Sequence, residues 1–243
     1  MIESWRSRAT GWLDALWPRA CAGCGGALAG EASLCASCEA QLRAIPVGAC
    51  PHCQRHPATA TGRCAERPSR DPLAACVSAV WLEAPVSDWI HRFKYPPPGL
   101  LGLAPGPAAA ARALALRAAR RAPEPSPDLV VPVPLHPRRL RARGFNPAAL
   151  LARALARSRG LDCDPLALER LRDTPSQTGL AIAARRRNVA GCMSARRRAP
   201  ACVWLVDDVL TTGATAREAA RALRAAGARR VVALAAARTP RRG

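Results

Sequence analysis

The sequence of 243 residues carries far more basic than acidic side chains. It has 37 lysine and arginine residues against 17 aspartate and glutamate residues, which gives a formal net charge of +20. No uncharged apolar run is long enough to cross a bilayer and no secretory signal is visible, so we expect a cytoplasmic protein without a transmembrane segment. The charge favours an anionic partner such as nucleic acid, although a merely solvated basic surface would have the same composition.

Residues 1–17 have the pattern of one short amphipathic helix. Their apolar side chains recur every three or four residues and therefore share one helical face. These side chains are Ile2, Trp5, Ala9, Trp12 and Leu16. Such a helix either packs on the domain beside it or docks on a membrane surface or a partner protein.

Cysteines are concentrated in the region that follows, which we place at residues 18–70. Cys21 and Cys24 form one CxxC pair, and Cys35 and Cys38 form a second pair after ten intervening residues. Zn²⁺ favours four thiolates in a tetrahedron, and a reducing cytosol disfavours disulfides, so the pattern predicts a structural zinc ribbon. Disulfides or free thiols are the alternative. Four cysteine ligands leave no open position on the metal for hydrolysis.

A third CxxC pair, Cys50 and Cys53, is followed by Cys64 without a partner at the expected spacing. These three residues predict a second zinc ion whose fourth ligand is His52 or His56, or else an eroded site. The pairs can also interleave around two ions. The remaining cysteines stand alone among apolar neighbours, and we expect them in the core: Cys76, Cys163, Cys192 and Cys202.

The rest of the chain, residues 76–243, alternates strand-like and helix-like segments. A stretch rich in proline and arginine, Arg67 to Pro72, reads as the linker to it. Ala108 to Arg121 is expected to be a helix, Leu129 to Val133 a short strand, and Leu150 to Arg159 a further helix. This alternation predicts an α/β fold in which a mostly parallel sheet carries helices on both faces.

Arginines follow the predicted strand at 129–133. Arg138, Arg139 and Arg143 lie in what we expect to be a loop, and Gly144 allows an unusual backbone angle there. Guanidinium groups bind phosphate oxygens in bidentate fashion, so this loop is suited to an anion. Arg187 lies within residues 162–195, which we expect to form a hood or mobile loop over the site. The alternative is a solvated basic surface.

The most specific pattern is VWLVDDVLTTGAT at residues 203–215. Val203 to Val206 has the continuous apolarity of a buried parallel strand, and Asp207 and Asp208 follow where open α/β sheets bind ligands. A phosphate-sized turn comes next, and a helix at 214–226 directs its positive end toward it. The turn consists of Thr211, Thr212, Gly213, Ala214 and Thr215. The order predicts a site for a sugar phosphate with Mg²⁺; the alternative is an ordinary turn with a capping aspartate.

This stretch resembles the signature of the type I phosphoribosyltransferases, which bind phosphoribosyl pyrophosphate, and departs from it only at Trp204. The resemblance implies that the catalytic residues Asp207 and Asp208 contact the ribose hydroxyls, directly or through Mg²⁺ and its waters. It also implies that the turn binds the 5-phosphate. It further implies a type I phosphoribosyltransferase-like sheet in the domain at 76–243.

The sequence as a whole resembles the ComF/GntX family, which combines a cysteine-rich N-terminal region with such a domain. The segments WIHRFKY at 89–95 and VPVPLHPRRLRARGFN at 131–146 support this resemblance. Pro147, Met193 and the missing eighth cysteine depart from it. In the related transferases the loop after the first core strand binds pyrophosphate. The family pattern thus implies a pyrophosphate role for the following basic residues: Lys94, Arg138, Arg139, Arg143 and Arg187.

These resemblances imply two roles and leave one alternative open. One is a phosphoribosyltransferase of unknown acceptor that uses Mg²⁺ and contains structural zinc. The family also implies a role in natural competence, in which imported single-stranded DNA is handled together with competence proteins. A non-catalytic protein that senses a nucleotide or phosphate, or binds single-stranded DNA, would use the same fold.

Overall fold

The computed structural model describes residues 19–28, 32–54, 64, 67–68, 70–96, 105–174 and 189–240. The helix expected at 1–17 and the candidate ligands His56 and Arg187 lie outside these described residues.

A four-stranded parallel sheet forms the centre of the protein, in the order β3-β8-β7-β4. This confirms the predicted parallel sheet. Its strands are β3 (Ala75–Trp81), β4 (Leu129–Pro132), β7 (Cys202–Leu210) and β8 (Arg230–Arg238). The two central strands, β7 and β8, consist mainly of buried valine, leucine and alanine, as expected for strands covered on both faces.

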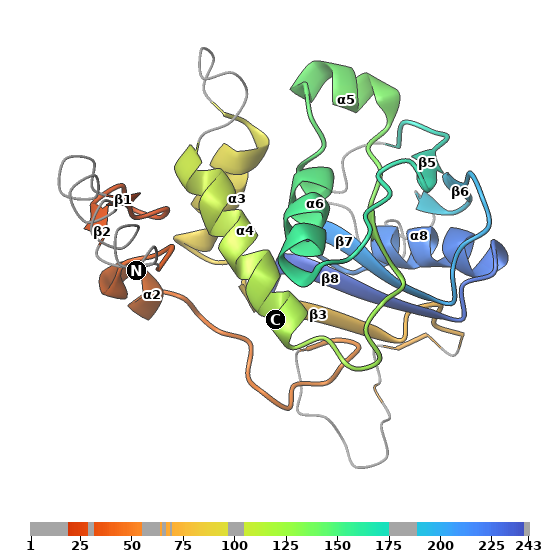
Figure 1. The fold of residues 1–243 in the computed structure, drawn as a ribbon, viewed down its shortest axis with the longest axis horizontal. Helices are drawn as coiled ribbons and strands as arrows, with labels where there is room; N and C mark the ends of the chain where they lie inside the picture. The colour runs from red at the N-terminus through yellow and green to blue at the C-terminus, as the bar shows by residue number, and fades with distance from the viewer. Residues whose placement is uncertain are drawn as a thin grey trace, which may run out of the picture.

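Helices cover both faces of the sheet, as Figure 1 shows. One face carries α4 and α6, with α3 packed against α4, and the other face carries α8. Their bounds are α3 (Val86–Lys94), α4 (Pro105–Arg120), α6 (Pro147–Arg159) and α8 (Ala214–Ala225). Small side chains such as Ala111 and Ala118 let α4 approach the sheet closely, and the bulky Trp204 fills the core beneath the helices.

The cysteine-rich region lies against α3 and α4, on the left in Figure 1. It contains the short antiparallel strands β1 (Arg19–Ala20) and β2 (Ala27–Leu28) and the helix α2 (Ala36–Ala40). A Cβ atom on Gly23 would lie 2.5 Å from the Trp89 ring of α3, so the two surfaces meet at van der Waals distance. Glu39 of α2 forms an ion pair with Arg117 of α4. The region is therefore docked on the α/β domain.

The arginines predicted to lie in a loop form a helix instead, α5 (Pro137–Arg143), seen at the top of Figure 1. His136 caps this helix through its side chain, Pro137 occupies the first turn, and Gly144 ends it with a φ of +82°. Residues 168–195 contain the antiparallel pair β5 (Leu168–Arg170) and β6 (Met193–Ala195). These strands flank residues 175–188, which lie outside the description.

The predicted linker at 67–72 also contacts the α/β domain. Asp71 within it has a fully buried side chain that forms an ion pair with Arg217 of α8. Of the four isolated cysteines, Cys76, Cys192 and Cys202 are buried as expected, and Cys163 is half-buried.

Candidate functional site

The acidic pair lies within strand β7, and not beyond its end as the sequence suggested. β7 continues to Leu210 because its pairing with β8 extends to Arg238. On the other side, β4 stops at Pro132, opposite Val206. Asp207 and Asp208 therefore occupy the first positions of β7 that extend past the last β4 pair. This places both carboxylates at the carboxyl edge of the sheet.

One cation already compensates this pair. The Nζ atom of Lys94, the last residue of α3, lies 2.9 Å from Oδ1 of Asp208, which is 8% exposed. Burial, and next the charge of Asp208, raise the pKa of Asp207 to about 7, although Lys94 opposes this shift. Two adjacent carboxylates with such a pKa are suited to a divalent cation, because Mg²⁺ prefers carboxylate oxygens.

The turn after β7 has the backbone geometry of an anion site. Gly213 adopts the left-handed conformation with φ +75°, and the Ala214 N–H donates to Thr212 Oγ1 at 3.3 Å. The helix α8 starts at Ala214, so the positive end of its dipole faces the turn. The turn predicted for the 5-phosphate thus directly follows the acidic pair at the same edge of the sheet.

The arginines of α5 divide into two groups. Arg143 Cζ lies 4.7 Å from the ring centroid of Tyr95, and its Nη2 donates to the Tyr95 hydroxyl at 2.9 Å. Because Tyr95 follows Lys94, this contact brings Arg143 to the end of α3 that also supplies the Asp208 partner. Arg138 and Arg139 instead pair with Asp173, close to the start of residues 175–188.

Arg170 is a candidate that the sequence analysis missed. Its guanidinium donates to Thr174 Oγ1, and its buried Nε has no hydrogen-bond partner among the described residues. Burial lowers the pKa of Arg170, while Cys192 and Asp207 are among the negative groups that oppose this shift. The positive charges of Lys94 and, more weakly, Arg170 both act to lower the pKa of Asp207, against its burial. No motif surrounds Arg170, so only the fold shows that its charge acts on Asp207.

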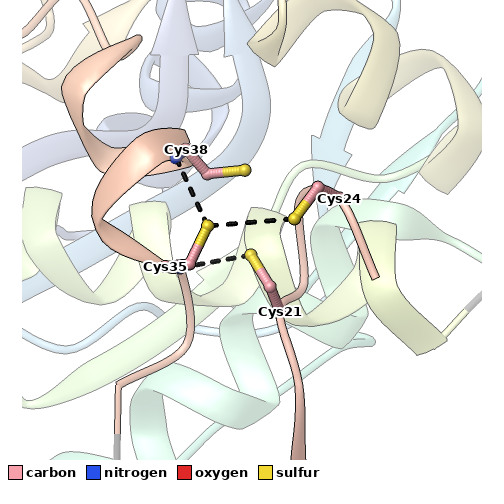
Figure 2. A group of neighbouring side chains, drawn as sticks. All are labelled: Cys21, Cys24, Cys35 and Cys38. Atoms are coloured by element: carbon pink, nitrogen blue, oxygen red, sulfur yellow. Dashed lines mark hydrogen bonds between the residues drawn. The ribbon is translucent and has the colours of Figure 1, made fainter. Parts of the chain in front are cut away.

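The first cysteine cluster has the arrangement of a zinc ribbon (Figure 2). The four sulfur atoms lie within 4.8 Å of one another, and Cys24 Sγ lies 3.8 Å from Cys35 Sγ. Burial would raise the pKa of Cys21, but N–H groups of Cys24, Cys35 and Gly23 outweigh it and lower the pKa to about 6. Burial, followed by the neighbouring thiols, raises the pKa of Cys38 to about 12. Four thiolates therefore need a cation such as Zn²⁺ to coexist.

The second cluster consists of Cys50, Cys53 and Cys64, whose sulfurs also lie within 4.8 Å of one another. The His52 N–H donates to Cys50 Sγ at 3.5 Å, but the His52 ring is not grouped with the three sulfurs. Within the described residues this group therefore has three members. Three converging thiols suit a second Zn²⁺ bound through cysteine.

Comparisons with known proteins agree with this architecture. Residues 12–68 match the family described as Double zinc ribbon domain. The chain is 33% identical over 212 residues to DNA utilization protein YhgH of Salmonella typhi, covering 86% of this chain and 85% of that protein. It is 34% identical over 205 residues to Competence protein F of Haemophilus influenzae, covering 80% and 85%. It is 32% identical over 208 residues to YhgH of Escherichia coli K12, covering 82% and 87%.

A search of solved structures found glutamine phosphoribosylpyrophosphate amidotransferase from B. subtilis, complexed with ADP and GMP. The match has a TM-score of 0.36 and 24% identity, and covers 52% of this chain and 26% of that chain. Among the helices of the described part, none is long and apolar enough to cross a membrane.

The fold and its clusters define an α/β protein with a parallel sheet that is preceded by a double zinc ribbon. The extent of the similarity to Competence protein F and YhgH narrows this class further. The chain belongs to the ComF family.

Proposed function

We propose that this protein binds phosphoribosyl pyrophosphate, or a closely related sugar phosphate, together with Mg²⁺ at the carboxyl edge of β7. One observation carries the proposal: the acidic pair, the left-handed turn at Gly213 and the start of α8 adjoin one another, while Lys94 pairs with Asp208. This set offers carboxylates to ribose hydroxyls and to Mg²⁺, and N–H and hydroxyl donors to a phosphate.

The residues would divide the work by charge. Thr211, Thr212 and Thr215 would bind the 5-phosphate together with the N–H groups of Gly213 and Ala214. Asp207 and Asp208 would hold the ribose side and Mg²⁺. When bound, Mg²⁺ would neutralise charge on the pyrophosphate. Arg143 and Lys94 would then contribute to the pyrophosphate side, because Lys94 ends α3 and Arg143 of α5 contacts Tyr95, the next residue.

The reaction that fits this arrangement is transfer of the phosphoribosyl group to an acceptor, in a process linked to DNA utilisation. The carboxylates would stabilise positive charge that develops on the ribose as the bond to pyrophosphate breaks, and the cationic side chains would hold the departing pyrophosphate. The names of the relatives, Competence protein F and DNA utilization protein, support the link to DNA.

A second function is favoured by charge. The net charge of +20 and the exposed arginines of α5, including Arg138 and Arg141, are suited to single-stranded DNA. In this case the site would bind a phosphate group without turnover. The two functions differ in a measurable way, because only the first releases pyrophosphate.

Titration calorimetry with phosphoribosyl pyrophosphate, with and without Mg²⁺, tests the proposal. We expect Mg²⁺-dependent binding by the wild type and at least tenfold weaker binding by Asp208→Asn, which keeps the shape of the side chain. Glu83→Gln, an exposed carboxylate paired with Arg43, is the matched control and should bind normally. Equal affinity of wild type and Asp208→Asn would refute the assignment. Pyrophosphate release in the presence of bases and small amines separates transfer from binding alone.

A further inference from the structure

A buried carboxylate connects the cysteine-rich region to the turn at residues 211–215, which we call the phosphate turn. The Asp71 side chain is fully buried, and its Oδ1 lies 3.1 Å from Nε of Arg217, whose side chain is 13% exposed. The same Oδ1 accepts the N–H of Leu73 at 3.1 Å. Removing one partner of a buried ion pair leaves the other charge uncompensated, so each residue fixes the other.

Arg217 also contacts the phosphate turn. Its Nη1 donates to the carbonyl oxygen of Thr212 at 2.8 Å. A Cβ atom on Gly213 would lie 2.9 Å from the same Nη1, so the guanidinium lies directly against the turn. In a trans peptide the C=O and the following N–H point in opposite directions. By binding the Thr212 carbonyl, Arg217 directs the Gly213 N–H away from itself.

The segment that carries Asp71 is anchored to the second cysteine cluster. The Arg67 N–H donates to the Cys64 carbonyl at 3.0 Å. The Pro51 carbonyl, next to Cys50, accepts the Cys76 N–H of β3 at 2.6 Å. Gln54, next to Cys53, donates from its side chain to the Ser78 carbonyl at 3.2 Å. The cluster, β3 and Asp71 therefore form one connected unit beside α8.

We propose that Asp71 is a positioning residue that, through Arg217, couples the second cysteine cluster to the phosphate turn. Folding of the cluster around its metal holds Asp71 in place, Asp71 orients Arg217, and Arg217 sets the peptide between Thr212 and Gly213. The role in ligand binding rests on the proposed function, whereas the mechanical coupling concerns the turn alone. The double zinc ribbon thus supports the anion site as well as the fold.

Two measurements on the full-length protein test this coupling. The first is amide hydrogen exchange at Ala214 and Arg217, whose N–H groups donate to Thr212 Oγ1 and to the Gly213 carbonyl in the absence of ligand. The second is the dissociation constant for ribose 5-phosphate, which probes the turn without the pyrophosphate. Both are compared in wild type, Asp71→Asn, Arg217→Gln and the double variant.

We expect Asp71→Asn to speed exchange at both amides at least fivefold and to weaken ribose 5-phosphate binding at least fivefold. The double variant should be no worse than Arg217→Gln, because both changes break one pathway. Cys53→Ser should speed exchange at the same amides. Leu223→Ala, a core change in α8, is the matched control: it should lower the melting temperature without a selective effect on the turn.

Unchanged exchange and affinity in Asp71→Asn, within twofold of wild type, would overturn the coupling. Effects of Asp71→Asn and Arg217→Gln that simply add would also overturn it. If the wild type does not bind ribose 5-phosphate, the proposed function fails, and the exchange data alone decide whether Asp71 positions the turn.

Discussion

Replacing Asp207 with asparagine is expected to stabilise the ligand-free protein at neutral and alkaline pH. Burial, and next the charge of Asp208, raise the pKa of Asp207 from 3.8 to about 7. The folded state therefore keeps this proton at pH values where the unfolded chain has lost it. The stability associated with the protonated carboxyl is fully present below pH 3.8, declines as the pH rises, and is lost above about 7.

The size of the effect follows from the difference between the pKa of Asp207 in the unfolded chain, 3.8, and in the folded protein, about 7. A pKa difference of one corresponds to about 1.4 kcal/mol of stability, and the difference for Asp207 is roughly three. Since Asp207 is partly accessible to solvent, we expect Asp207→Asn to gain on the order of 2–4 kcal/mol at pH 8 relative to the wild type. Below pH 4 the two proteins should have nearly equal stability, because the wild-type side chain is then neutral.

Urea unfolding of both proteins between pH 4 and pH 8 measures this difference. Asp88→Asn, in the first turn of α3 at the opposite end of this helix from Lys94, is the matched control and should show no such pH-dependent gain. A stability difference between wild type and Asp207→Asn that stays constant over the whole range would refute the reasoning. It would mean that Asp207 titrates alike in the folded and unfolded states.

Three further predictions concern pyrophosphate, zinc and DNA. Arg143→Ala should weaken phosphoribosyl pyrophosphate about tenfold in calorimetry and leave ribose 5-phosphate unchanged, with the exposed Arg141→Ala as control; equal losses for both ligands would contradict its role. Cys38→Ser should lower the zinc content measured by mass spectrometry and destabilise the ribbon, whereas anaerobically purified wild type without zinc would reject the metal site. Single-stranded DNA affinity should fall at least tenfold between about 50 and about 200 mM salt, and salt-independent binding would remove the polyanion argument.

The sequence predicted the parts of the fold that depend on local pattern. The continuous apolar run before Asp207, the helix at α6 and the spacing of the cysteine pairs each carry a periodicity or spacing that few other structures produce. β3 was missed because its sequence, ACVSAVW, consists largely of small residues with modest strand preference. Only pairing with β8 makes it a strand.

The errors near the site have different causes. α5 was expected to be a loop because arginine and proline are dense there, yet the cap at His136, Pro137 in the first turn and Gly144 at the end were readable helix signals. The extension of β7 beyond the acidic pair depends on how far β8 accompanies it, which is a property of the sheet.

Contacts between distant segments could not be read at all. Asp71 and Arg217 are 146 positions apart, and Lys94 and Asp208 are joined only when α3 packs at the end of the sheet. The pattern around residues 203–215 thus supplied the candidate carboxylates and the turn. Of their cationic partners, only Lys94 was already a candidate, through the family resemblance. Arg170 and Arg217 were found only from the tertiary structure.

A crystal structure with phosphoribosyl pyrophosphate and Mg²⁺ would test the central proposal most directly. We expect the 5-phosphate within the turn at 211–215, the ribose hydroxyls on the side of Asp207 and Asp208, and Lys94 moved from Asp208 toward the pyrophosphate. An empty turn at saturating ligand, with Lys94 still paired to Asp208, would contradict the account.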